Sequence, residues 1–280
     1  MPIDRSRYEA FAREIEEIMR GVSPEEGLAR LRARLLDWIA QRGLSTLDAA
    51  ETEAYLRQLL GEEMAPFVAD VLDAHRRTLD AVEHHYADLG VTLPRDFGRI
   101  VAIERANRLD LGNYSDDVLR RIAQVTRAAV VRGDTVRELS ATLRRLDDRT
   151  RAYGLTLART QIKTVGRVGK AEKARIAGVS YFEYVGLRRL TNRPFCHVLV
   201  GTTLHIDTIH QLRNGNREPV LHCCGGWNCI HDWEPDPFAT TGTFEDRPDA
   251  SLISFRDGRR EVVIPGGASA QAAYLTHTSA

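Results

Sequence analysis

The segment LHCCGGWNCIH, residues 221 to 231, concentrates thiol and imidazole side chains in an otherwise ordinary chain. It holds three of the four cysteines, and the fourth, Cys196, lies a short distance upstream. A secreted disulfide scaffold is normally a short chain with its cysteines spread along it, whereas this chain has 280 residues and crowds its cysteines into one segment. The crowding favours a metal site or a local structural knot.

A structural zinc ion takes four ligands, usually thiolates and imidazoles, and can close a loop that the local core could not hold. If residues 228 to 232 are extended, Cys229 and His231 are two apart and point to the same face. The two glycines after Cys224 allow a tight turn that brings this cysteine to them. Cys196 would then supply the fourth ligand.

Spacing alone leaves this ligand set open. Cys223, His222 and His197 lie beside the same residues and are interpreted as neighbours of the site. The alternative is a metal-free core, in which buried cysteines pack as small apolar groups.

An enzymatic alternative is a nuclease of the ββα-metal type, in which His222, Asn228 and His231 hold a metal ion that activates water on a phosphodiester. The segment DWEPDPF that follows is broken by proline, whereas such a site needs a helix there. The chain also lacks a phosphate-cradling glycine loop and the patterns HExxH and GxSxG. We therefore expect a protein that is not an enzyme.

All three lysines fall in KTVGRVGKAEKAR, residues 163 to 175, where arginines join them. In a helix these side chains form either a solvated basic surface or a face that binds phosphates. The chain has 39 basic and 39 acidic residues, so any attraction for nucleic acid must be local. The candidate nucleic-acid face, expected to be exposed, consists of Arg159, Lys163, Arg167, Lys170 and Lys173.

The composition, 43% apolar, is that of a soluble globular protein of one or two domains. No stretch approaches the ~18 consecutive apolar residues of a membrane helix, and the start MPIDRSRYEAFAREIEE lacks the order of a signal peptide. We expect no membrane segment and a reducing cytoplasm at synthesis.

Residues 4 to 88 have apolar positions at intervals of three and four, which predicts successive helices. Helix starts are expected at Ser23 and Ser45, whose hydroxyls can cap a first turn. The expected breaks are Gly21, Gly43 and Gly61.

A helix is predicted from Ser115 to Gly133, a second from Asp134, and a third that ends at Gly178. Residues 179 to 187 are β-branched and aromatic and predict a strand, and further extended pieces are expected around Gly201. The fold class predicted is α+β and predominantly helical, with a helical N-terminal domain followed by a helical layer on a small mixed sheet.

The segment SLISFRDGRREVVI, residues 251 to 264, predicts a hairpin turning on Asp257 and Gly258, and the tail after it looks unfolded alone. The predicted division is an N-terminal helical domain, residues 1–98, a second domain, residues 99–237, and a connector with hairpin and flexible tail, residues 238–280.

Residues 191 to 235, TNRPFCHVLVGTTLHIDTIHQLRNGNREPVLHCCGGWNCIHDWEP, resemble the C-terminal core of phage minor head proteins of the Mu F-like, head-morphogenesis type. In that family a PFC segment precedes a leucine, a glycine and a short helix, and a CGG(Y/W)NCRHxW segment closes the core. Ile230 replaces the frequent arginine. Upstream, ART at residues 158 to 160 resembles the family's ARTE motif, with Gln161 in place of glutamate.

The resemblance covers about residues 115 to 236 and implies a structural virion protein, made in the host cytoplasm, that acts in head morphogenesis and in DNA packaging or delivery. The implied partners are the phage portal protein, capsid components and phage DNA, with several copies around the portal. The positions that match the family's cysteine and histidine pattern are Cys196, Cys224, Cys229 and His231, which we expect to bind one structural zinc ion under the cover of Trp227 and Trp233.

Overall fold

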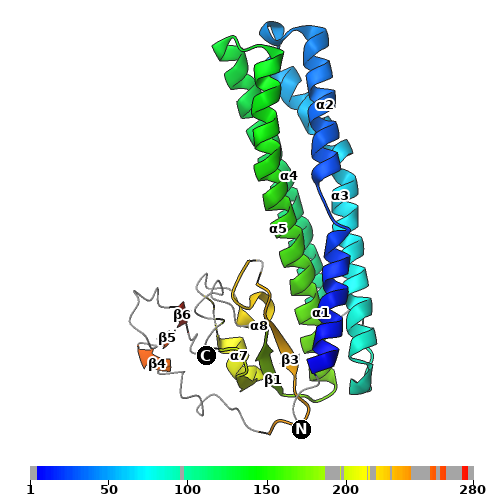
Figure 1. Ribbon diagram of the computed structural model, residues 1–280, viewed down its shortest axis with the longest axis vertical. Helices are drawn as coiled ribbons and strands as arrows, with labels where there is room; N and C mark the ends of the chain where they lie inside the picture. Colours follow the sequence, from blue (N-terminus) through cyan, green and yellow to red (C-terminus); the bar gives the residue numbers. More distant parts are fainter. Residues whose placement is uncertain are drawn as a thin grey trace. The chain divides into compact units, whose positions relative to one another are not determined.

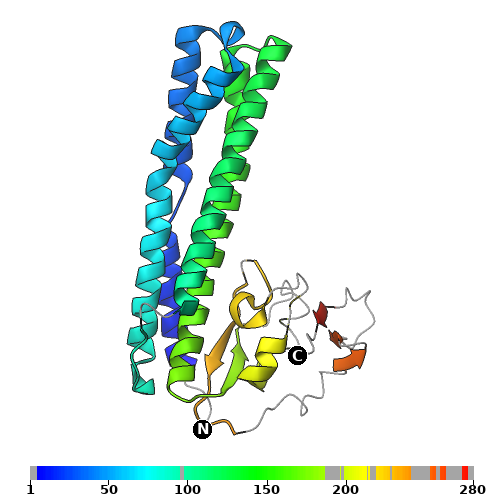
Figure 2. The same ribbon diagram turned by 180° about the vertical axis from the view of Figure 1, so that it is seen from behind.

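The structure, a computed structural model, has long helices followed by short strands (Figure 1 and Figure 2), which confirms a predominantly helical α+β fold. It describes residues 5–94, 98–186, 196, 199–212, 214, 219–227 and 229–240, and the strands 253–256, 259–262 and 273–276. The helices are α1 (Arg5–Arg20), α2 (Glu25–Arg42), η1 (Leu44–Thr46), α3 (Ala49–His85), η2 (Ala87–Leu89), α4 (Gly98–Arg132), α5 (Val136–Ile176), α7 (Ile206–Gln211) and α8 (Val220–Cys223). The strands are β1 (Tyr181–Val185), β2 (Thr203–His205), β3 (Asp232–Pro235), β4 (Ile253–Arg256), β5 (Arg259–Val262) and β6 (Ala273–Thr276).

The chain folds into two compact units, each assembled from segments that are distant in the sequence. Unit 1 contains Met1–Glu16, Thr78–Val101 and Thr160–Ala280, and unit 2 contains Glu17–Arg77 and Ala102–Arg159. This arrangement differs from the predicted linear division at residue 98, because α1, α3, α4 and α5 each contribute residues to both units.

The glycine breaks predicted in the N-terminal region are confirmed at two of three positions. Gly21 follows α1, and Gly43 ends α2 with a φ of 85°, a conformation that glycine adopts without strain. The break predicted at Gly61 is wrong, because this residue lies inside α3. A single glycine costs a helix only about 1 kcal/mol, so the flanking apolar positions carry the helix through it.

Two predicted helix starts are also wrong. α3 begins at Ala49 rather than after Ser45, and Asp48 caps it by accepting the Glu51 N–H at 2.9 Å. Ser115 lies inside α4, where its hydroxyl donates to the Leu111 carbonyl at 3.1 Å instead of capping a first turn.

The two helices predicted between Asp134 and Gly178 form the single helix α5. Its start is a capping box, in which Thr135 Oγ1 accepts the Glu138 N–H at 3.3 Å and Glu138 accepts the Thr135 N–H at 2.7 Å. Gly178, with a φ of 77°, follows its last turn as predicted.

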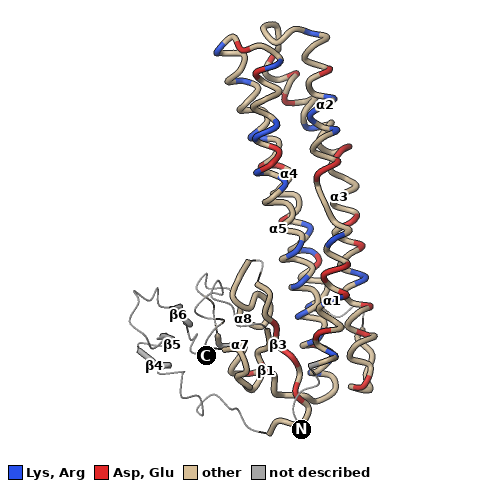
Figure 3. Tube along the Cα trace, in the orientation of Figure 1, with Lys and Arg blue, Asp and Glu red and all other residues tan. Residues whose placement is uncertain are grey.

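Unit 2 packs α2 and parts of α3, α4 and α5 around apolar stripes, to which Leu28, Leu31 and Leu35 belong. Gly27 lets α2 approach the backbone of α3 at Glu63, where a Cβ would collide with the carbonyl oxygen. Charged residues of both signs are interspersed along these helices (Figure 3). Among the described residues, no helix is long and apolar enough to cross a membrane.

Unit 1 contains a three-stranded sheet of order β2-β1-β3. β1 confirms the strand predicted at residues 179 to 187, and β2 lies just after Gly201. Phe182 faces Leu204 across one strand pair, and Tyr184 faces Trp233 across the other. The sheet was predicted to be mixed, but both pairs are antiparallel, because no parallel crossover connects the strands.

The core of unit 1 lies between this sheet, α5 and the short helices α7 and α8. Gly169 of α5 allows close packing, since a Cβ there would lie 3.1 Å from Leu79 Cδ2. Trp233, 2% exposed, donates its indole N–H to the Val220 carbonyl at 3.2 Å. The largest apolar side chains of the cluster are Phe182, Tyr184, Leu199, Leu204, Ile209, Leu212, Leu221 and Trp233.

The predicted C-terminal hairpin is present as the antiparallel pair β4 and β5, with Arg256 opposite Arg259. Its expected turn residues Asp257 and Gly258 lie outside the described residues. The tail, predicted to be unfolded alone, contributes β6, which pairs with β5 and completes a second antiparallel sheet.

Candidate metal centre

Three side chains predicted as metal ligands converge in unit 1. Cys196, Cys229 and His231 are buried, and their sulfur and nitrogen atoms all lie within 4.8 Å of one another. The two cysteines are 33 residues apart in the chain, with Sγ atoms 3.7 Å apart. His231 stands two residues after Cys229 and directly before β3, with its Nδ1 3.5 Å from Cys229 Sγ.

These distances match the edges of a tetrahedral zinc site. With Zn–S near 2.3 Å and Zn–N near 2.0 Å, two sulfur ligands are about 3.8 Å apart, and a sulfur and a nitrogen ligand are about 3.5 Å apart. The observed distances, 3.7 Å and 3.5 Å, agree with both. All four cysteines are free thiols. The described residues therefore form a group that could hold a metal ion.

The thiols of Cys196 and Cys229 are electrostatically coupled. The hydrogen bond from Cys196 lowers the pKa of Cys229, and a hydrogen bond with His231 and the charge of Arg167 act in the same direction, against the effect of burial. The same hydrogen bond, together with burial, raises the pKa of Cys196. The lowered pKa of Cys229 favours the thiolate, which is the form of cysteine that binds metals.

The His231 ring is held in place by its neighbours. The ring of Tyr184 lies nearly parallel to it, with centroids 5.6 Å apart and an interplanar angle of 5°. On another side Gly186 provides the space, because a Cβ there would lie 3.0 Å from the imidazole Cγ and closer still to Cδ2. Gly186 has a φ of 146°, which side-chain-bearing residues rarely adopt.

The structure does not place Cys224, the fourth predicted ligand, in this group. Cys224 is fully buried but follows the last residue of α8 with a φ of 47°, and its carbonyl accepts the Asn214 side-chain amide at 3.2 Å. The turn thus occurs at Cys224 itself and at Gly226, φ 100°. The prediction assigned the turn to the glycines alone, and this difference leaves the Cys224 thiol outside the cluster.

The residues predicted to lie beside the site differ in their surroundings. Cys223 is half-buried. Burial lowers the pKa of His222 to about 4, and the nearby His210 and Arg99 act in the same direction. His197 and Asn228 lie outside the described residues. Of the two tryptophans expected as a cover, Trp233 is buried, with its ring centroid 4.7 Å from that of Tyr184, whereas Trp227 is 36% exposed.

Arg167 of α5 fixes the backbone around the cluster. Its guanidinium donates to the carbonyls of His222, Cys229 and His231 at 3.1, 2.9 and 2.7 Å. Lys163 donates to the Cys229 carbonyl at 3.3 Å. These contacts tie both sides of the loop to one helix and bring positive charge to the thiols.

The predicted nucleic-acid face on α5 is wrong for three of its five residues. Arg167, Lys170 and Lys173 are only 4%, 0% and 1% exposed. Lys163 is half-buried, and Arg159 is exposed. A basic stripe in a sequence does not reveal whether its side chains will face solvent or buried acidic residues from distant segments. Here acidic residues surround the stripe.

The acids that face these cations were missed by the sequence reasoning. Lys170 Nζ lies 2.6 Å from Asp232 Oδ2 and 3.5 Å from Glu234 Oε2, both on β3, whose acidic residues are visible in Figure 3. Lys173 Nζ lies 2.5 Å from Glu83. The sequence pattern that could have indicated them is the alternation of Asp232 and Glu234 around Trp233, because it places both carboxylates on one face of the strand.

Glu234 has no exposed side-chain surface and links β3 to the first part of the chain. Its carboxylate accepts the Tyr86 hydroxyl at 2.6 Å and lies 3.2 Å from the Arg7 guanidinium. Burial raises the pKa of Glu234, while the charges of Lys170 and Arg7 and the Tyr86 hydrogen bond oppose this shift. A buried charge with this many partners serves to position the strand.

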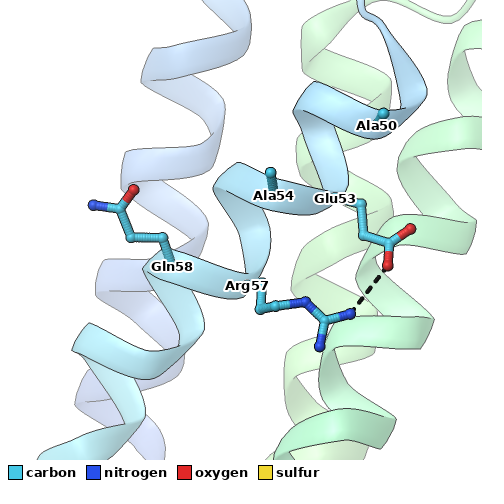
Figure 4. A pocket seen from close by; sticks show the side chains of 5 residues that line it. All are labelled: Ala50, Glu53, Ala54, Arg57 and Gln58. Atoms are coloured by element: carbon cyan, nitrogen blue, oxygen red, sulfur yellow. Dashed lines mark hydrogen bonds and ion pairs between the residues drawn. The ribbon is translucent and has the colours of Figure 1, made fainter.

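A separate hollow lies in unit 2 along α3, lined by Ala50, Glu53, Ala54, Arg57 and Gln58. Figure 4 shows Arg57 joined to Glu53, at 3.1 Å. Glu53 and Arg57 neutralise each other, two alanines form another part of the wall, and Gln58 points away from this pair, so the hollow lacks the convergent polar groups of a binding site.

Compared with known proteins, the chain matches no protein-family model, no curated protein and no solved structure.

Proposed function

We propose that Cys196, Cys229 and His231 bind one zinc ion that holds residues 196 to 235 together, and that the chain is a structural minor head protein of a phage particle. The observation that supports the metal site most directly is the convergence of ligand atoms from sequence-distant segments at tetrahedral distances.

The burial of the cluster favours a structural role for the ion over a catalytic one. The exposed fractions of Cys196, Cys229 and His231 are 1%, 4% and 2%. A catalytic zinc ion has three protein ligands and keeps its fourth position open to water or substrate, whereas a structural ion is enclosed by four protein ligands, so the proposed structural role requires one further ligand from the chain. Structural zinc binding can contribute on the order of 10 kcal/mol to a small module, which exceeds the net stability of many domains.

The head-protein assignment rests on the sequence pattern. The segment that begins with PFC and the segment that ends with NCIHDW are the most specific parts of the resemblance, and Cys196 and Cys229 come from these two segments. In this proposal the zinc joins them into a small α/β module whose surface docks on the portal protein or on capsid components. Phage DNA is a further partner during packaging or delivery.

Co-purification tests this assignment. The chain is expressed together with the portal protein of the same phage, and the complex is isolated through a tag on the portal. We expect the wild-type chain and Cys223→Ser to be retained, and Cys229→Ser to be lost, since only the last substitution removes a ligand. Failure of the wild-type chain to bind portal or assembled heads would contradict the assignment, as would cleavage of plasmid DNA by the chain with added zinc or magnesium.

A further inference from the structure

Tyr184 contacts the side chains of all three ligand residues. Its hydroxyl oxygen lies 3.5 Å from Cys196 Sγ and 3.8 Å from Cys229 Sγ. Its ring lies parallel to the His231 ring at a centroid distance of 5.6 Å. The side chain has no exposed surface, so water does not compete for these contacts.

The position of Tyr184 is set by the sheet rather than by a metal. Its N–H donates to the Thr202 carbonyl at 2.9 Å, and its carbonyl accepts the Gly201 N–H at 2.7 Å. The Trp233 ring packs against the Tyr184 ring in a T-shaped arrangement, with centroids 4.7 Å apart. Folding of β1 therefore delivers a rigid hydrogen-bond donor to the place where the two sulfur atoms meet.

The chemistry of this contact follows from the atoms involved. A thiolate bound to a metal still accepts hydrogen bonds, and the phenolic O–H is a donor. Such a bond withdraws charge from sulfur and fixes its direction, and groups of this kind typically change metal affinity by about 10- to 100-fold when they are removed.

We propose that Tyr184 is a positioning residue of the metal site, which orients the nearer thiolate, that of Cys196, by donating its one hydroxyl proton, and orients the plane of His231 through its ring. This inference rests on the metal binding proposed above. It assigns to one residue of β1 the task of setting how tightly the ion is held.

The test uses the full-length chain and the variant Tyr184→Phe, which keeps the ring and removes only the hydroxyl. Zinc affinity is measured by competition with a chromophoric chelator, and the sulfur-to-metal charge-transfer band is recorded with cobalt as the probe. We expect Tyr184→Phe to bind zinc about 10- to 100-fold more weakly. The cobalt band should move to lower energy, because sulfur that has lost a hydrogen bond gives up its electrons more readily.

A control variant separates this effect from a general loss of packing. Tyr114→Phe loses a buried hydrogen bond to the Thr150 carbonyl in unit 2, away from the ligands. It should leave the energy of the cobalt band unchanged, even where it lowers the melting temperature.

The outcomes distinguish this inference from the one on which it rests. A wild-type chain that binds neither zinc nor cobalt overturns the proposed metal site itself. If the wild type binds metal, and Tyr184→Phe binds zinc with the same affinity and has its cobalt band at the same energy, only the role of Tyr184 is overturned. Should Tyr184→Phe fail to fold, a fluorinated tyrosine at position 184 strengthens the donor and should move the band to higher energy. An unmoved band there also counts against the inference.

Discussion

Lys170 and Asp232 form an ion pair that joins α5 to β3, with the lysine Nζ 2.6 Å from the carboxylate and no exposed surface on the lysine side chain. Asp232 directly follows His231, so this pair fixes the backbone next to the candidate metal ligands. The ion pair thus connects the packing of unit 1 to the geometry of the site.

Replacement of Lys170 by methionine should destabilise the protein by about 3–5 kcal/mol, because it removes the cation 2.6 Å from Asp232 and leaves the buried Glu234 with Arg7 as its remaining cation. Chemical denaturation measures the change. Arg159→Met, on an exposed position of the same helix, is the control and should change the free energy of unfolding by less than about 0.5 kcal/mol. Equal, small effects of both substitutions would contradict the buried pairing.

His75 should make the stability of the protein dependent on pH. Burial lowers the pKa of His75 to about 4 from its ordinary 6.5, and the charge of Arg108 acts in the same direction. The unfolded chain therefore binds a proton more readily than the folded one. The stabilising contribution is complete above pH 6.5 and is lost as the pH falls towards 4, which amounts to about 3 kcal/mol.

The variant His75→Gln checks this contribution, because glutamine retains a polar group near Asn107, 3.4 Å from His75 Nε2, but does not titrate. The free energy of unfolding of the wild type should fall between pH 6.5 and pH 4, and the slope should be smaller in the variant. Parallel curves for the two proteins would show that His75 is not the group responsible.

Gly186→Ala should impair metal binding. The added Cβ collides with the His231 ring, and the φ of 146° is strained for alanine, at a cost of about 1–3 kcal/mol. Gly178→Ala is the matched control, since Gly178 also has a positive φ of 77° but no atom within 4 Å of the added Cβ. We expect both variants to lose stability and only Gly186→Ala to lose zinc affinity. Loss of affinity in Gly178→Ala as well would indicate a general effect.

The helices were predictable where a local apolar period defines them, as in α1 and α2. The ends of the helices were less predictable. Ser115 is a residue type that often caps a helix and Gly61 one that often ends a helix, but both lie within apolar stripes that continue on either side. Propensity at one residue, worth about 1 kcal/mol, is outweighed by the burial of several leucines and valines.

The candidate site was predictable only in part. Cys229 and His231 alternate in an extended segment, and Cys196 is the remaining cysteine of the chain and also matches the family pattern. The conformation of Cys224 depends on a positive φ at a residue other than glycine, which has no clear sequence signal. The burial of Lys170 and Lys173 depends on Asp232 and Glu83, residues 62 and 90 positions away in the sequence. Such pairings are set by tertiary structure, so a local pattern of charge could not reveal them.

Metal content and chelator sensitivity of the purified protein, kept under reducing conditions, test the central claim most directly. We expect one equivalent of zinc per chain, its loss in Cys229→Ser, and its retention in Cys224→Ser, since only the first thiol belongs to the cluster. Removal of zinc by chelator should expose residues 196 to 235 to protease while the helical circular dichroism signal persists. Protein that contains no metal as purified, takes up none when zinc is added, and melts identically with and without chelator would contradict the account.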